Sequence, residues 1–94
     1  MYVIIDGNEI RTRDELHDAF AQALHLDEEY GRNLDALYDV LSTRFAETNV
    51  RICDPDALKE NLGPYVDRFF DMLLMATEEN HHVTARVRLS READ

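Results

Sequence analysis

The spacing of three strand-like segments along the chain is the feature that most constrains its fold. Residues 2–6, 49–53 and 83–89 are short and rich in β-branched side chains, and two helical segments separate each from the next. Parallel strands need a crossover of a dozen or more residues between them, which is usually helical. The sequence therefore predicts an α/β fold: a small single domain, residues 1–94, in which a three-stranded parallel β-sheet is packed with about four helices.

Residues with known capping preferences mark the ends of the predicted helices. Thr12 and Asn33 are predicted N-caps of the first two helices, because their short side chains can accept a hydrogen bond from the first turn. Gly31 is predicted to relieve the turn before Asn33. Asp54 is predicted to cap the third helix, which Gly63 ends. The fourth helix follows and stops at the sequence ENHH.

Two apolar faces are predicted to reach the core from the second half of the chain. The first lies on the fourth helix and consists of Phe69, Phe70, Leu73, Leu74 and Ala76. The second lies on one face of an alternating strand and consists of Val83, Ala85, Val87 and Leu89. The opposite face of that strand carries Thr84, Arg86 and Arg88. We therefore expect a half-buried strand at an edge of the sheet, where arginines oppose wrong pairing.

The charge of the chain limits the partners that it can bind. Twenty acidic and ten basic residues give a net charge of −10 at neutral pH. This charge argues against direct binding of nucleic acid and against anionic membrane surfaces, since both would be repelled. The charge is suited to a basic protein partner, and it is equally explained by good solubility without any such partner. The single cysteine excludes an intrachain disulfide, and the N-terminus lacks the basic region of a signal peptide, so we expect a soluble cytoplasmic protein.

The sequence nominates no catalytic, metal or cofactor site. It has no glycine-rich phosphate-binding motif after a strand and no metal-ligating spacing of histidine or cysteine. Cys53 could act as a nucleophile, but its place in a predicted strand, between Ile52 and the helix cap Asp54, favours a packed thiol in the core. His17 and His25 could share a helix face, and a metal site built from them is the less favoured interpretation. An enzyme is therefore the least favoured function, and no cofactor is expected.

An acidic surface that contains one aromatic residue points instead to binding. Asp35, Tyr38 and Asp39 are spaced i, i+3 and i+4, so a helix places them in one patch. Two carboxylates four residues apart weaken a helix by a few tenths of a kcal/mol, and aspartate is a poor helix former. The patch is interpreted either as a solvated polar face or as a protein–protein contact, for which an embedded tyrosine is a suitable anchor.

Two segments near the N-terminus, IDGNEIRTRDELHDAF and LDEEYGRNLDALYDVLS, resemble barstar and the barstar-like proteins, which inhibit small ribonucleases. The resemblance is close from residue 4 to residue 42 and continues as a match of element order to the last strand. It implies a small α/β domain with three parallel strands, whose activity is binding and not catalysis. It also implies a partner, a basic ribonuclease or ribonuclease toxin. The chain would be a monomer when free, bind one-to-one, and act as an immunity protein or antitoxin.

The resemblance also implies which residues enter the active site of the enzyme. Asp39 matches the aspartate that occupies the place of a substrate phosphate, and Asp35 and Asn33 match further contact residues. Tyr38 stands where the family commonly has tryptophan. The expected partner-binding residues, all on the second helix or the loop before it, are Glu29, Tyr30, Gly31, Asn33, Asp35, Tyr38, Asp39 and Ser42.

Some positions depart from the family pattern. Glu29 replaces an aromatic residue, Arg32 adds a positive charge to the loop, and residues 43–44 are Thr-Arg in place of Gly-Trp. A further family acid on the late helix has two nearby candidates, Glu78 and Glu79. These changes concern the identity of the partner, whereas the mode of binding is expected to be retained. The alternative is a non-inhibitory binding module of the same fold with another basic protein partner.

Overall fold

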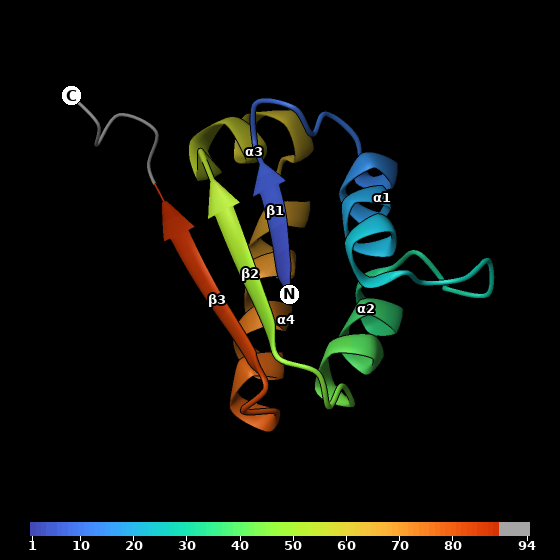
Figure 1. Ribbon diagram of the computed structural model, residues 1–94. Coiled ribbons are helices and arrows are strands. Elements are labelled where there is room, and N and C mark those ends of the chain that lie inside the picture. Colours follow the sequence, from blue (N-terminus) through green and yellow to red (C-terminus); the bar gives the residue numbers. More distant parts are fainter. Residues whose placement is uncertain (89–94) are drawn as a thin grey trace.

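The computed structural model describes residues 1–88 and contains the predicted strands and helices in the predicted order (Figure 1). The elements are β1 (Tyr2–Asp6), α1 (Arg13–Leu24), α2 (Leu34–Ser42), β2 (Thr48–Cys53), α3 (Pro55–Leu62), α4 (Tyr65–Glu79) and β3 (Val83–Arg88). All three strands belong to one parallel sheet. The predicted fold class is therefore confirmed.

The sheet has β2 at its centre, with β1 paired on one side and β3 on the other. In this register Ile52 of β2 lies between Ile5 of β1 and Val87 of β3. Side chains alternate between the two faces of a strand, so one face of the sheet receives the buried residues Val3, Ile5, Val50 and Ile52. Because the order is β1-β2-β3, β3 is an edge strand within residues 1–88, as its arginines predicted, and β1 is the other edge.

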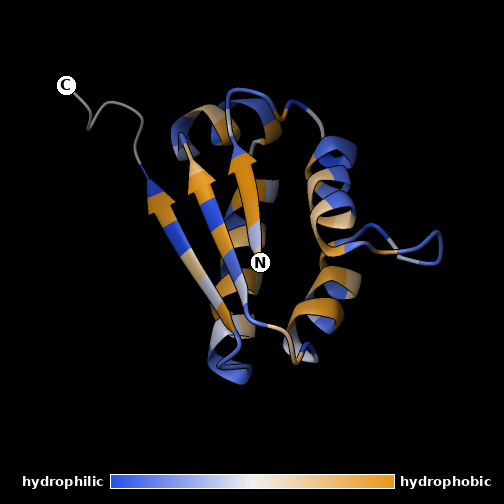
Figure 2. Ribbon diagram, viewed as in Figure 1, coloured by the Kyte–Doolittle hydropathy of each residue, from blue (hydrophilic) through white to orange (hydrophobic). Residues whose placement is uncertain are grey.

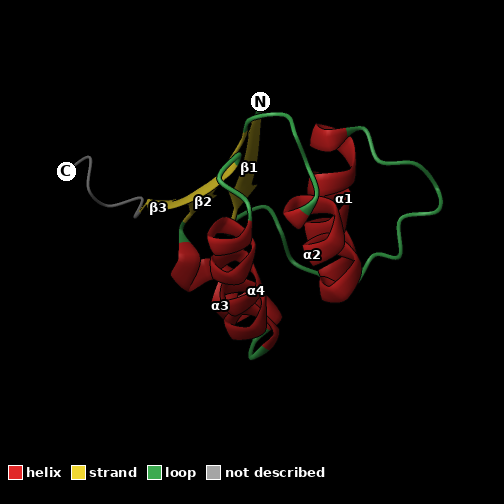
Figure 3. Ribbon diagram, turned by 90° about the horizontal axis from the view of Figure 1, so that it is seen from below, coloured by secondary structure: helices red, strands yellow, loops and turns green. Residues whose placement is uncertain are grey.

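The helices lie on one side of the sheet, and the opposite face carries no helix within residues 1–88 (Figure 3). α1 contacts β1, and α4 contacts α2, α3 and β3. The core lies between the two layers, where the rings of Phe20 and Phe69 meet edge to face with centroids 5.9 Å apart. On the open face, the side chains of Tyr2 and Ile4 remain exposed.

Hydrophobic and hydrophilic residues alternate along β3 (Figure 2), but the far half of the strand is more exposed than this pattern predicts. Val83 is buried, but Ala85 is exposed and 58% of Val87 is accessible to solvent. Leu74, which belongs to the predicted apolar face of α4, is also 61% exposed. The prediction of a half-buried strand is therefore wrong beyond Val83, because a groove separates Ala85 and Val87 from the side chains of α4 that face them. Leu89 lies outside the described residues.

The caps of α1 and α3 agree with the predictions only in part. The Thr12 hydroxyl accepts a hydrogen bond of 3.1 Å from the first turn of α1, as predicted. Asp54 does not cap α3 with its side chain, which instead accepts a hydrogen bond from the amide of Asn8. Asp54 is the N-cap residue of α3, as predicted, but its backbone is left-handed, with φ of 54°, and no side-chain capping bond forms. Gly63 ends α3 as predicted, with φ of 64°.

Candidate partner-binding surface

The predicted partner-binding carboxylates lie on the exposed side of α2. Leu37 and Leu41 are fully buried and hold the helix against the core. Asp35 and Asp39 are exposed one helical turn apart, as their spacing predicted. Within residues 1–88, no side-chain hydrogen bond or ion pair involves either carboxylate. Both carboxylates are therefore available to a cation from outside the protein.

Tyr38 and Ser42 border the carboxylates and are each half-buried. Tyr38 packs against the hydrophobic core, so its ring contributes to the fold as well as to the surface. The hydroxyl of Thr43 donates to the backbone carbonyl of Asp39 at 2.7 Å, and the hydroxyl of Ser42 lies 3.4 Å from the same carbonyl. These bonds satisfy the last turn of α2 and leave the Asp39 carboxylate uninvolved.

The N-terminus of α2 begins at Asn33, as predicted. The side-chain oxygen of Asn33 accepts a hydrogen bond from the backbone N–H of Ala36 at 2.7 Å. The left-handed residue of the preceding turn is Arg32, with φ of 55°, and not Gly31. A Cβ atom on Gly31 would lie 3.1 Å from the Cβ of Ala36. The turn is therefore relieved at Arg32, contrary to the prediction, and Gly31 contributes through its small size.

The positive charge that Arg32 adds to the loop is directed toward α1. Its guanidinium donates to the carboxylate of Asp18 at 2.7 Å and to the backbone carbonyl of Asp14 at 2.9 Å. The Asp14 carboxylate lies 3.8 Å from the same guanidinium nitrogen. Exposed ion pairs contribute little to stability. This one fixes the direction of the loop and keeps the arginine against acids of α1, so that it is not an unpaired cation beside Asp35.

A buried histidine holds the same loop to the core. His17 of α1 is 1% exposed, and its Nδ1 lies 2.6 Å from the hydroxyl of Tyr30 while its Nε2 lies 2.8 Å from the hydroxyl of Tyr65. A neutral imidazole has one donor and one acceptor, so one hydroxyl donates and the other accepts. Burial, followed by the charge of Arg32, lowers the pKa of His17. Burial is also the main cause that raises the pKa of Tyr30 and of Tyr65, so the network is uncharged at neutral pH.

This network changes the interpretation of two residues. Tyr30 is half-buried and its hydroxyl is used inside the protein, so only the exposed part of its ring is available to a partner. His17 was a metal candidate together with His25, but His17 is buried and His25 is exposed. The structural role of His17 had a signal in the sequence, because it lies three residues before Phe20 and seven before Leu24, on the apolar face of α1.

Glu29, predicted to bind the partner, is exposed in the loop between α1 and α2. Its backbone N–H donates to the side chain of Asp27 at 3.0 Å. The backbone N–H of Tyr30 donates to the carbonyl of Asp27 at 3.2 Å. The loop therefore has an internal turn that presents acidic side chains to solvent.

Phe45 is an exposed aromatic residue that the sequence alone did not single out. It lies just beyond the end of α2 and is 89% exposed. The segment around it is fixed by the buried amide of Asn80, which donates to the carbonyls of Leu41 and Arg44 at 2.9 and 2.8 Å. An isolated aromatic residue in a loop has no periodic neighbours, so its exposure could not be predicted from spacing.

A hollow of about 400 Å³ lies beside Asp35, between α1, α4 and the first turn of α2. Tyr65 lines it, and the guanidinium groups of Arg13 and Arg68 lie 4.3 and 5.6 Å from the centroid of the Tyr65 ring. Within residues 1–88, neither of these arginines takes part in an ion pair. The acidic surface therefore has a cationic border on the side of α4.

The alternative sites considered from sequence were a reactive cysteine and a metal centre. Cys53 is half-buried and lines the open face of the sheet beside Arg51. The prediction of a core thiol is wrong, because residue 53 alternates with the buried Ile52. Among residues 1–88, no group of three or more His, Cys, Asp or Glu side chains could hold a metal ion. No helix in this part of the chain is both long and apolar enough for a transmembrane span.

Nearly the whole chain matches one known protein family. Residues 1–90 match the family described as Barstar (barnase inhibitor). The chain belongs to the barstar family. A protein of Bacillus subtilis (strain 168) named "Putative ribonuclease inhibitor YrdF" is 34% identical over 79 residues, which cover 82% of this chain and 86% of that protein. The barstar resemblance of the sequence is therefore confirmed, and the barstar match spans every strand and helix from β1 to β3.

Proposed function

We propose that this barstar-family protein inhibits a small basic ribonuclease by placing α2 and the loop before it in the active site of the enzyme. Its family and the name of its Bacillus subtilis relative support a role of this kind. The observation that carries the proposal is the pair Asp35 and Asp39, which is exposed and has no side-chain partner among residues 1–88. The pair weakens its own helix, and an external cluster of cations compensates for that cost.

Asp39 takes the place of a substrate phosphate in this proposal. A ribonuclease binds the phosphates of RNA with cationic side chains, and a carboxylate offers those side chains the same charge and a similar set of acceptor oxygens. Arginine–carboxylate pairs are frequently bidentate, and their hydrogen bonds are about twice as strong as those between neutral groups. Asp35, one turn away on α2, binds a second cation of the enzyme. Tyr38 lies between the two and packs against the aliphatic parts of the same cationic side chains.

The net charge of −10 acts before contact is made. Complementary charge increases the rate of association, and the increase falls with ionic strength because the Debye length is about 8 Å at physiological salt. A one-to-one complex formed in this way would protect the RNA of the cell that makes the enzyme. In that setting the protein acts as an immunity protein or antitoxin.

The cationic border formed by Arg13 and Arg68 narrows the choice of enzyme. Their guanidinium groups lie beside Tyr65 at the hollow that Asp35 also lines. A uniformly basic partner would be repelled at this border. The proposal therefore includes a partner whose basic active site has an acidic residue at the edge that faces α4.

The test is a titration of RNA cleavage by a panel of small basic bacterial ribonucleases at low and moderate salt. We expect inhibition of one enzyme to saturate near one equivalent and to weaken as salt increases. Binding of a basic enzyme without loss of RNA cleavage would instead favour the alternative, a non-inhibitory binding module that uses the same surface.

Charge-neutralising variants then locate the surface. Removing one partner of a desolvated charge pair costs about 2–5 kcal/mol of binding free energy, so Asp39→Asn should weaken inhibition by at least tenfold and Asp35→Asn should have the next largest effect. Glu60→Gln removes an exposed carboxylate from α3 and serves as the matched control. Wild-type inhibition by both aspartate variants would contradict the proposal.

A further inference from the structure

The outer edge of β3 is open to backbone pairing within the described chain. β3 is the last strand of the sheet, and no strand of residues 1–88 pairs with its outer side. The carbonyls of His82 and Arg88 accept hydrogen bonds from the backbone N–H groups of Thr48, the first residue of β2, and of Asp54, just after β2, at 2.8 and 3.0 Å. Successive residues of a parallel strand direct their backbone groups alternately to the two sides. Ala85 and Val87, which lie at the intervening positions, therefore direct theirs away from β2.

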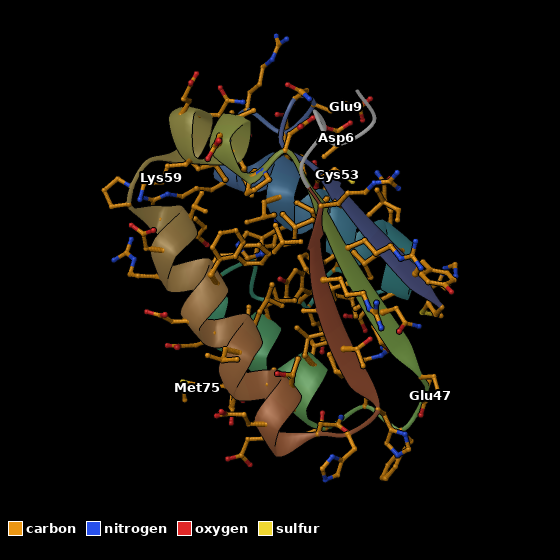
Figure 4. The ribbon with its side chains drawn as sticks, turned by 90° about the vertical axis from the view of Figure 1, so that its left-hand side faces the viewer. Asp6, Glu9, Glu47, Cys53, Lys59 and Met75 are labelled. Atoms are coloured by element: carbon orange, nitrogen blue, oxygen red, sulfur yellow. The ribbon has the colours of Figure 1, made fainter. Side chains whose placement is uncertain are left out.

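An apolar groove runs beside this open edge. It has a volume of about 560 Å³ and lies between β3 and α4, with Phe70, Leu73 and Leu74 on one wall and Val83, Ala85 and Val87 on the other. Leu74 is 61% exposed and Val87 is 58% exposed. Figure 4 looks onto this edge, with β3 in front, α4 beside it and Met75 projecting from α4. The groove therefore offers exposed apolar surface next to unpaired backbone.

The other face of the same strand is cationic. Arg86 and Arg88 of β3 are exposed, and Arg51 of β2 lies beside Arg86 in the register of the sheet. None of the three takes part in an ion pair within residues 1–88. Arg51 is stacked on the ring of Tyr2, with its guanidinium carbon 4.6 Å from the centroid. In a chain with a net charge of −10, this face is a local positive patch.

We propose that the outer edge of β3 binds an extended segment of a partner protein as a fourth strand, and that acidic and apolar residues alternate in this segment. Backbone pairing to an exposed edge is an established mode of peptide recognition, with specificity from alternate side chains. The two sides of β3 define that alternation. Side chains on one face of the added strand enter the groove, and those on the other face meet Arg86 and Arg88. The positive charge of these arginines selects a partner strand that carries acidic side chains on that face.

A second copy of this chain fits the edge poorly. Pairing two β3 strands about a twofold axis would place Arg86 and Arg88 of both copies close together on one face of the joined sheet, and neighbouring like charges destabilise a sheet. Two chains of charge −10 would add a general repulsion. The edge is also on the side of the molecule away from α2 and the loop before it (Figures 1 and 3). The proposed strand and a ribonuclease can therefore bind at the same time.

The test uses a fluorescent, end-capped peptide of sequence Glu-Val-Glu-Ile-Glu-Val-Glu and its lysine counterpart, titrated with the full chain. Fluorescence anisotropy is measured near physiological salt, where a Debye length of about 8 Å limits repulsion by distant acids. We expect the glutamate peptide to bind at least tenfold more tightly than the lysine peptide. Arg86→Glu should weaken binding of the glutamate peptide at least tenfold, whereas Arg11→Glu, the matched change of an exposed arginine outside the patch, should have a smaller effect.

Two further variants test the strand geometry and the groove. Ala85→Pro removes an outward N–H that the sheet does not use and should abolish binding of the glutamate peptide. Leu74→Glu, at an exposed position on α4, should do the same by placing a charge in the groove, and it tests the proposal even if the proline variant is poorly folded. Equal binding of the two peptides, absence of binding at about 1 mM protein, or tight binding to folded forms of both variants would overturn the proposal. So would sedimentation of the wild-type chain as a dimer that Arg86→Glu alters.

Discussion

Lowering the pH below about 6.5 should destabilise this protein through His17. The imidazole is 1% exposed and both of its nitrogens contact tyrosine hydroxyls, at 2.6 and 2.8 Å. Its burial lowers its pKa from the ordinary value of 6.5. The unfolded chain therefore binds this proton at a higher pH than the folded protein does. Above the pKa that His17 has in the unfolded chain, this histidine does not change the free energy of unfolding. The free energy of unfolding falls as the pH decreases through that pKa, and it levels off once the imidazole is also protonated in the folded protein.

The size of the effect follows from the same linkage. One pH unit corresponds to 1.36 kcal/mol per proton, so at about pH 5.5 this one histidine lowers the free energy of unfolding by at most about 1.4 kcal/mol. In a domain of this length, each kcal/mol shifts Tm by roughly 4–8 °C. The change is therefore measurable, and it also loosens Tyr30 and the loop that carries the proposed binding residues.

The assay is urea unfolding followed by circular dichroism, at pH values from about 7.5 to 5.5, on the wild type and on His17→Gln. The glutamine amide can donate and accept hydrogen bonds but does not titrate. Carboxylates contribute to both proteins, so the difference between their pH dependences isolates His17. His81→Gln, which removes an exposed histidine, serves as the matched control. Equal losses of stability in the wild type and His17→Gln over this range would refute the reasoning.

Three further predictions concern the scaffold and the surface beside Asp39. Asn80→Ala should lower the free energy of unfolding in urea by about 2–3 kcal/mol, because two backbone carbonyls at the end of α2 lose their buried donor; a loss below about 0.5 kcal/mol would contradict this. Gly7→Ala should cost about 3 kcal/mol or more and reduce the soluble yield, because its Cβ would lie 2.6 Å from the backbone nitrogen of Leu58 and the backbone must move; a Tm equal to that of the wild type would contradict this prediction. Phe45→Ala should leave Tm unchanged, because an 89% exposed ring supports no core contact. It should weaken inhibition of the cognate ribonuclease by about 1 kcal/mol or more, because exposed aromatic rings are typical anchors of protein interfaces. Unchanged inhibition would place Phe45 outside the interface.

Features governed by local rules could be predicted from the sequence. The order of elements, the N-caps at Thr12 and Asn33 and the end of α3 at Gly63 depend on a few neighbouring residues, and the structure has them as predicted. The exposure of Asp35 and Asp39 on α2 followed from helical periodicity, because Leu37 had to face the core. Their role in binding depends on a partner and remains a prediction.

Features that depend on how distant elements meet could not be predicted in the same way. The exposure of Val87 is set by the groove between β3 and α4, and an alternating pattern does not encode how closely a helix packs on a strand. The contacts of His17 with Tyr30 and Tyr65 join α1, a loop and α4, so the histidine looked like one of several unassigned histidines. The direction of Arg32 likewise depended on where α1 lies, because its charge is paired there with Asp18.

The attachments of the loop between α1 and α2 have a consequence for the kinetics of binding. Tyr30 is held by His17, Arg32 by Asp18, and Asn33 by the first turn of α2, so residues 25–33 have a defined conformation in the free protein. Fixing the backbone of one residue costs about 1–2 kcal/mol of conformational entropy. That cost is met when the chain folds, so under the proposed function the loop would bind the enzyme without further ordering. Related enzymes would then be captured at similar rates and differ mainly in residence time, so selectivity would be a property of the dissociation rate.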